Sequence, residues 1–151
     1  MFNESSRSKA GKVPPGGVSG AGWKPPREAP GAAADVLVVE DDDLIREHLA
    51  EIFRDEGYSV ATAADGKEAL RRLDEIDVGV VVLDLMMPVM SGWDVAATLR
   101  STPRLATLPV LTITAVGNAH RAPGGPVFLK PLNVESLVRA VAMHLGARSR
   151  R

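Results

Sequence analysis

Two short apolar runs, each ending at acidic residues, dominate the hydrophobic pattern of the chain. The first is Val36–Val39, which four acidic residues follow, and the second is Val80–Leu83, which Asp84 follows. Runs this short and rich in β-branched residues favour an extended backbone over a helix. Because neither run alternates with polar residues, both are typical of parallel strands that are covered on both faces.

Elsewhere along the chain, apolar residues recur at the three- and four-residue spacing of amphipathic helices. The pattern predicts helices after Asp43 and Asp65, over residues 93–100, and after Asn133. Asp43 and Asn133 are predicted N-caps, Asp65 opens a capping box, and Gly57 ends the first helix. Weaker apolar runs predict three further strands, over residues 58–63, 110–114 and 127–129.

Strands that alternate with helices predict right-handed βαβ units, and therefore a parallel sheet with helices on both faces. Five strands fit the α/β, flavodoxin-like, doubly wound fold with strand order 2-1-3-4-5. In that order the first, third, fourth and fifth strands are contiguous. Their carboxyl ends therefore meet at one edge of the sheet, where this class of fold binds its ligands.

Polar residues follow each of these four strands: Glu40 and Asp41, then Asp84, Thr114 and Lys130. Asp84 alone could cap a turn or be the reactive centre, but turn capping does not explain the convergence. Carboxylates held together repel unless a cation joins them, and an all-oxygen ligand set favours Mg²⁺, with Mn²⁺ in its place as an alternative. A carboxylate can attack phosphorus, and the Lys130 ammonium and Thr114 hydroxyl could then contact the phosphoryl oxygens.

The composition narrows the classes of function. The chain has 151 residues, enough for one domain, and its net charge of −1 does not indicate direct binding of nucleic acid. It has no cysteine, which excludes disulfides and thiol chemistry. Neither a membrane span nor a secretory signal is predicted, so a cytoplasmic location is expected.

Residues 1–34 differ from the rest of the chain. They hold six glycines, five prolines, five Lys/Arg and two acidic residues, which gives a charge of +3 and few apolar side chains. We expect a flexible basic tail here, with contact to an acidic partner through Trp23 as the alternative. The predicted domain covers residues 35–147, and residues 148–151 form a basic end.

The motifs at the strand ends resemble the receiver domain of two-component response regulators. They are Val-Val-Glu-Asp-Asp at 38–42, Leu-Asp-Leu-Met-Met-Pro at 83–88 with Ser-Gly at 91–92, Thr-Ala at 114–115, and Lys-Pro at 130–131. The resemblance implies a domain that accepts a phosphoryl group from a sensor histidine kinase or phosphotransfer protein. It further implies a Mg²⁺-dependent reaction and a signal relayed to a downstream protein by contact.

The resemblance also implies a role for each matching residue. Asp84 matches the phosphoacceptor, and Asp41 matches a direct Mg²⁺ ligand. Glu40 matches an outer ligand that acts through water, and Met86 matches the residue whose backbone carbonyl completes the metal site. Thr114, with Ala115 beside it, matches the switch hydroxyl. Lys130 matches the phosphate-binding lysine, followed by a cis bond to Pro131.

Two departures from the family pattern concern how the signal leaves the site. The position three residues before Lys130, usually aromatic, is Val127, and Phe128 is expected to face the other side of the sheet. Residues 116–126, rich in Gly and Pro, leave the family's fourth helix shortened or absent.

Three hypotheses follow. The leading one is a single-domain receiver, because few residues follow the last predicted helix. Such a domain is not an enzyme beyond slow self-phosphorylation and self-dephosphorylation. The second is a phosphate-independent scaffold or phosphate sink, which the altered output region favours. The third is a haloacid-dehalogenase-like phosphatase. Met86 argues against it, because that family usually carries an aspartate two residues after the nucleophile.

Overall fold

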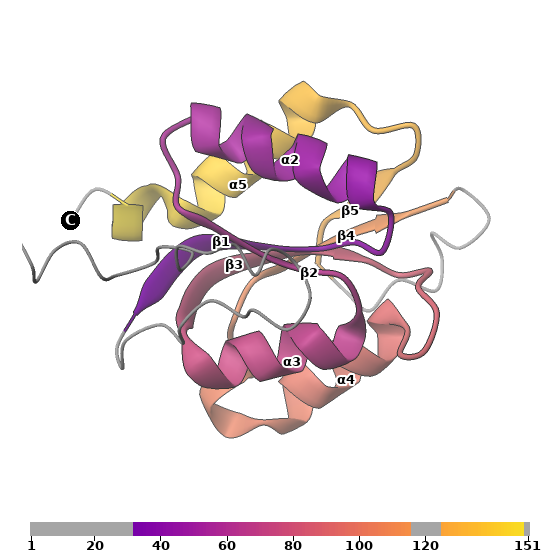
Figure 1. Cartoon of the computed structure of the whole chain (residues 1–151). Coiled ribbons are helices and arrows are strands. Elements are labelled where there is room, and N and C mark those ends of the chain that lie inside the picture. Colours follow the sequence, from indigo (N-terminus) through magenta and orange to yellow (C-terminus); the bar gives the residue numbers. More distant parts are fainter. Residues whose placement is uncertain (1–31, 116–124, 150–151) are drawn as a thin grey trace, which may run out of the picture. The chain divides into compact units, whose positions relative to one another are not determined.

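The two apolar runs lie side by side in the centre of a five-stranded parallel sheet (Figure 1). The computed structural model describes residues 32–115 and 125–149. The strand order is β2-β1-β3-β4-β5, as predicted. The strands are β1 (Ala33–Val39), β2 (Val60–Ala63), β3 (Asp77–Asp84), β4 (Val110–Thr114) and β5 (Val127–Leu129).

Helices cover both faces of this sheet. Among the described residues they are α2 (Asp43–Asp55), α3 (Gly66–Glu75), α4 (Gly92–Ser101), the short 3₁₀ helix η1 (Pro103–Leu105) and α5 (Val134–Ser149). Figure 1 shows α2 and α5 on one face, and α3 and α4 on the other. This doubly wound arrangement confirms the predicted fold class.

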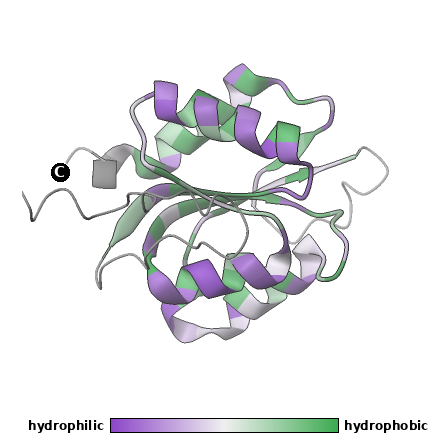
Figure 2. Cartoon of the chain, viewed as in Figure 1, coloured by the Kyte–Doolittle hydropathy of each residue, from purple (hydrophilic) through white to green (hydrophobic). Residues whose placement is uncertain are grey.

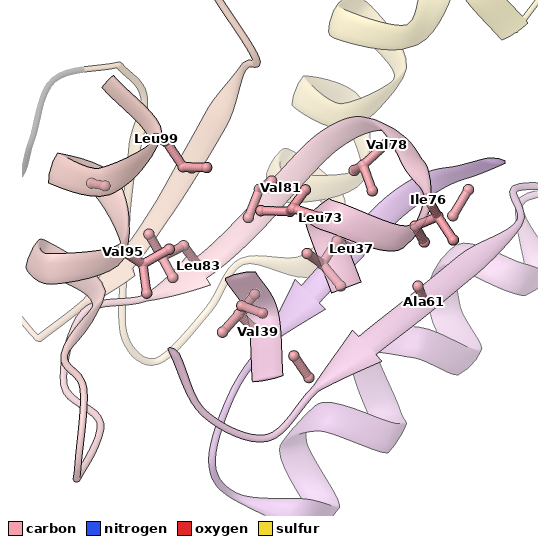
Figure 3. Packing of buried hydrophobic residues seen from close by; sticks show 14 of the residues in the cluster. Leu37, Val39, Ala61, Leu73, Ile76, Val78, Val81, Leu83, Val95 and Leu99 are labelled. Carbon is pink, nitrogen blue, oxygen red and sulfur yellow. The ribbon is translucent and has the colours of Figure 1, made fainter. Parts of the chain in front are cut away.

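The apolar runs separate two buried clusters because successive side chains of a strand point to opposite faces. Leu37, Val39, Val81 and Leu83 pack with α3 and α4 (Figure 3), whereas Val36, Val38, Val80 and Val82 pack with α2 and α5. Figure 2 shows hydrophilic residues on the outer sides of the helices, as expected for helices that pack on a sheet. Full coverage on both faces explains why these strands do not alternate with polar residues.

Side-chain caps begin the helices largely as predicted. Asp65 accepts a hydrogen bond from the backbone of Glu68, and Asn133 from that of Ser136. The prediction for α2 was wrong by one residue, because Asp42 rather than Asp43 is the N-cap and accepts from the backbone of Ile45. Three consecutive aspartates, at 41–43, offered equivalent caps, and only the path of the backbone chooses among them.

Some boundaries and one short element differ from the predictions. β1 begins at Ala33, inside the segment predicted as tail, because Ala33 and Ala34 pair with β3. α5 continues to Ser149, past the predicted end of the domain at 147, and η1 was not predicted. Most of the 1–34 segment and residues 116–124 lie outside the described residues. The flexible tail and the shortened or absent helix between β4 and β5 therefore stay predictions. None of the helices in the described ranges is long and apolar enough to cross a membrane.

Candidate functional site

The register of the central strands places the acidic residues together. β1 and β3 pair through Val39 and Leu83, so the next residues along, Glu40 and Asp84, leave the two strands at the same level. Both follow the alternation that points toward the α2 and α5 face. The predicted convergence at the carboxyl edge is therefore present.

Three carboxylates form the centre of the site. One carboxylate oxygen from each of Glu40, Asp41 and Asp84 lies within 4.8 Å of the others. Glu40 and Asp84 are buried, at 2% and 1% exposed, whereas Asp41 is exposed. The cluster therefore opens to solvent on the side of Asp41, which leaves access for a cation or an anionic group.

Lys130 brings a positive charge to this cluster from the end of β5. Its Nζ lies 3.6 Å from Asp84 Oδ2 and 3.9 Å from Glu40 Oε1. The backbone N–H of Lys130 donates to the carbonyl of Thr114, which fixes the lysine beside the end of β4. The Lys130–Pro131 peptide bond is cis, as predicted.

Burial and crowding favour the protonated forms of the two buried acids. Burial raises the pKa of Glu40 from 4.5 to about 7, and the charge of Asp84 adds to this rise. Burial also raises the pKa of Asp84, while the Met86 N–H, the Lys130 charge and Glu40 oppose the rise. One lysine does not balance three carboxylates, so a further cation is electrostatically favourable here.

The hydrogen bonds of the buried acids leave room for such a cation. Asp84 Oδ1 accepts from the backbone N–H of Met86, and Glu40 Oε2 accepts from that of Asp42. Glu40 Oε1, in contrast, is buried without a hydrogen-bond partner among the described residues. An orphaned buried carboxylate oxygen beside two other carboxylates fits a hard divalent cation such as Mg²⁺.

The remaining predicted site residues lie on the neighbouring strand ends. Thr114 is fully buried, and its hydroxyl has no hydrogen-bond partner within the described part of the chain. Ala115 follows it and is exposed, which leaves space at this side of the pocket. Val127 is half-buried, and Phe128 packs against the α2 and α5 cluster, so it does not replace the missing aromatic residue.

Two residues outside the predicted set of site residues support the site. Gly92 lies so close to the strand end that a Cβ there would lie 2.5 Å from the Asp84 carbonyl oxygen. Arg46 donates from its guanidinium to the carbonyl of Glu40 at 2.9 Å. The Ser-Gly motif offered a signal for the first; no signal in the sequence marked the second.

Comparison with known proteins adds the family context. Residues 36–142 match the sequence model of the response regulator receiver domain. Response regulator RR06 of Streptococcus pneumoniae is 37% identical over 84 residues, which are 56% of this chain and 37% of RR06. The chain spans about a third to a half of the length of the first curated relatives that it matches.

Solved structures match the fold over most of the chain. The chemotaxis protein CheY4 of Vibrio cholerae has a TM-score of 0.66 and 30% identity, and the match covers 76% of this chain and 99% of CheY4. The receiver domain of the sensor histidine kinase PA1611 from Pseudomonas aeruginosa has a TM-score of 0.69 at 24% identity, over 76% of this chain and 99% of that domain. The PA1611 structure has a magnesium ion in its active-site cleft; at this identity the likeness carries the fold alone.

Proposed function

Because this chain belongs to the response regulator receiver domain family, we propose that it accepts a phosphoryl group on Asp84 from a phosphorylated histidine. The donor is a sensor histidine kinase or a phosphotransfer protein, and a downstream protein reads the modified domain. The observation that carries this proposal is the meeting of three carboxylates and Lys130 at one sheet edge. The family consists of signalling domains, and the half-exposed Met86 offers no acid or base for phosphatase turnover.

In the proposed transfer, an Asp84 carboxylate oxygen attacks phosphorus, and the bond from phosphorus to the donor imidazole breaks. The products are an aspartyl phosphate and a neutral imidazole on the donor. Lys130 Nζ, already 3.6 Å from Asp84, would bind a phosphoryl oxygen, and the unpartnered Thr114 hydroxyl would donate to another. Both groups would stabilise the negative charge on the phosphoryl oxygens during the transfer.

The metal ligands would be Asp41 and Asp84 directly, Glu40 through water, and the backbone carbonyl of Met86. Bound Mg²⁺ would neutralise phosphoryl oxygens and the crowded carboxylates. Glu40 Oε1 is buried without a hydrogen-bond partner among the described residues, which supports a metal ion or a metal-bound water next to it. Mn²⁺ would serve in its place, since it prefers the same oxygen ligands.

Labelling with a small phosphoryl donor tests this proposal. We expect acetyl phosphate with Mg²⁺ to add one phosphoryl group to the wild-type chain, as measured by intact mass. Asp84→Asn should gain none, and chelation of Mg²⁺ should abolish the gain. Labelling of Asp84→Asn to the level of wild type, or none in wild type, would contradict the proposal.

One observation favours a second function, that of a phosphate sink or scaffold. Val127 stands where the family usually carries the aromatic residue that moves inward on phosphorylation, and Phe128 packs on the opposite face. We expect beryllofluoride, a mimic of the aspartyl phosphate, to shift the backbone amide resonances of the pocket, Lys130 included, and to change those of the other residues between 116 and 145 only weakly. Amide shifts across residues 116–145 as large as those of receiver domains that carry the aromatic residue would exclude this second function.

A further inference from the structure

Arg46 lies in the first turn of α2 and contacts the acidic segment from outside the pocket. Its side chain is only 14% exposed, whereas that of its neighbour Glu47 is 65% exposed. Its Nη1 donates to the backbone carbonyl of Glu40 at 2.9 Å, and its Nη2 pairs with the carboxylate of Asp43. One guanidinium therefore joins the two ends of the segment 40–43.

This segment is where the backbone leaves the sheet. The N–H of Glu40 makes the last sheet-like bond, to Ala63 at 3.1 Å, while its carbonyl turns to Arg46. Asp42 then begins α2 as its N-cap and donates its own N–H to Glu40 Oε2. Asp41 lies between these two anchored residues, so the direction of its exposed carboxylate depends on their backbone.

We propose that Arg46 is a positioning residue for the metal site, and this inference rests on the proposed function. It holds the backbone carbonyl of Glu40 and the side chain of Asp43, so that the Asp41 carboxylate faces Glu40 and Asp84 before a cation binds. Arginine suits this task because its planar fork donates to two acceptors at once and stays charged. Groups that orient metal ligands in this way commonly change metal affinity without touching the metal.

Replacement of the guanidinium should separate metal binding from chemistry. We expect Arg46→Ala to weaken Mg²⁺ binding about tenfold, in the range typical for lost outer partners of metal ligands. Asp84 and Lys130 are unchanged, so the rate of labelling by acetyl phosphate at saturating Mg²⁺ should stay close to that of wild type. Isothermal titration with Mg²⁺ gives the affinity, and labelling rates over a range of Mg²⁺ give the second measure.

Three variants make the test specific. Arg46→Lys keeps one donor and should fall between wild type and Arg46→Ala. Asp43→Ala removes one of the two contacts at a side chain that is 83% exposed, and should weaken Mg²⁺ binding about two- to threefold. Arg54→Ala is the matched control, because Arg54 lies on the same helix and its pair with Glu47, at 3.9 Å, is remote from the pocket.

The outcomes distinguish this inference from the proposed function. Mg²⁺ affinity equal to wild type in a folded Arg46→Ala would overturn the inference alone. So would a lower saturating rate with unchanged affinity, because that result indicates a general structural role. If Arg46→Ala does not fold, unchanged affinity in both Arg46→Lys and Asp43→Ala overturns it. A wild-type chain that neither binds Mg²⁺ nor is labelled overturns both proposals.

Discussion

At the scale of single residues, Glu40 carries the clearest signature of a binding site. It is a carboxylic acid at the end of a buried strand, 2% exposed, and among the described residues its Oε1 has no hydrogen-bond partner, only the Lys130 ammonium at 3.9 Å. Such a group destabilises the ion-free fold when it is charged and is stabilised by a bound cation. Glu40 should therefore contribute to a dependence of the stability of the domain on both pH and Mg²⁺.

The pH dependence follows from the raised pKa of Glu40, which changes from 4.5 to about 7. Between these values the folded chain holds a proton that the unfolded chain has released, so the free energy of unfolding falls as pH rises. The full contribution is present below pH 4.5 and is lost as pH rises through about 7. Its size is on the order of 3 kcal/mol, at about 1.4 kcal/mol per pKa unit.

Urea unfolding in a chelating buffer at pH 5 and pH 8 measures this effect. We expect wild type to lose stability over this interval relative to Glu40→Gln, which does not titrate. Added Mg²⁺ should stabilise wild type more at pH 8 than at pH 5, since it competes with the proton. Parallel pH curves for the two proteins would show that Glu40 ionises normally.

Val89 is a second residue with a testable local signature. Its φ is 69°, and the hydrogen bond from the Met90 N–H to the Pro88 carbonyl, at 2.7 Å, closes a γ-turn around it. This conformation strains a β-branched residue, and the side chain is 82% exposed, so it gains little from packing.

Replacement of Val89 by glycine should raise the free energy of unfolding. We expect a gain of up to about 1 kcal/mol, because relief of positive-φ strain exceeds the entropy that glycine adds to the unfolded chain. Val89→Ala keeps the Cβ and should show little gain, which makes it the matched control. Chemical denaturation of wild type, Val89→Gly and Val89→Ala measures the free energy of unfolding. An equal gain in the two variants would argue against backbone strain at this position.

At the scale of elements, the junction of β3 with α4 positions the phosphoacceptor. The N–H of Gly92 donates to the carbonyl of Leu85 at 2.9 Å, so the start of α4 returns to the end of β3. A Cβ at Gly92 would lie 2.5 Å from the Asp84 carbonyl oxygen and 2.6 Å from the Leu85 Cα. Both are backbone atoms, which cannot move without moving the strand end.

Gly92→Ala should therefore affect stability and labelling together. We expect a loss of about 2 kcal/mol in the free energy of unfolding, as for other overpacked sites, and slower labelling of Asp84. Gly146→Ala is the matched control, since nothing lies within 4 Å of its added Cβ on α5. That variant should be neutral or slightly stabilising. Denaturant unfolding and intact mass measure the two effects, and a Gly92→Ala protein as stable as wild type would contradict the close contact.

At the scale of the whole folded domain, an apolar groove adjoins the acidic pocket. It has a volume of about 610 Å³ and lies between α2 and the start of α5, and its lining residues are Leu44, Ile45, His48, Leu49, Lys130, Pro131, Leu132 and Val134. Lys130 therefore belongs both to this groove and to the phosphoryl site, 3.6 Å from Asp84. That continuity favours the phosphoryl-donating protein as the molecule that covers the groove.

A substitution in this groove should distinguish a protein donor from a small one. Leu44 is 83% exposed, so we expect Leu44→Ala to fold normally and to be labelled by acetyl phosphate as wild type is. Transfer from a histidine kinase that phosphorylates wild type should fall about fivefold or more, as for an interface anchor. Met143→Ala, on an exposed position of α5, is the control. Equal transfer to all three proteins would exclude this groove as the contact surface.

The sequence alone determined the strand order and which polar residues lie at the strand ends, where they form the candidate site. Both follow from patterns along the chain, because apolar runs mark covered strands and the parallel order brings their polar ends together. It misassigned the N-cap among residues 41–43, since three neighbouring aspartates have the same capping chemistry and only the backbone path selects Asp42.

Only the tertiary structure decided which of these groups are buried, and which contacts hold them. The raised pKa of Glu40 depends on its burial and on how near Asp84 and Lys130 lie, and the lack of a hydrogen-bond partner at its Oε1 depends on the same packing. The contact of Arg46 with the Glu40 carbonyl depends on the backbone path from β1 to α2. The close approach of Gly92 to β3 depends on the backbone path from β3 to α4. Burial, hydrogen bonding and pKa change when atoms move by an ångström or less, and the order of residues along the chain does not give distances at that precision.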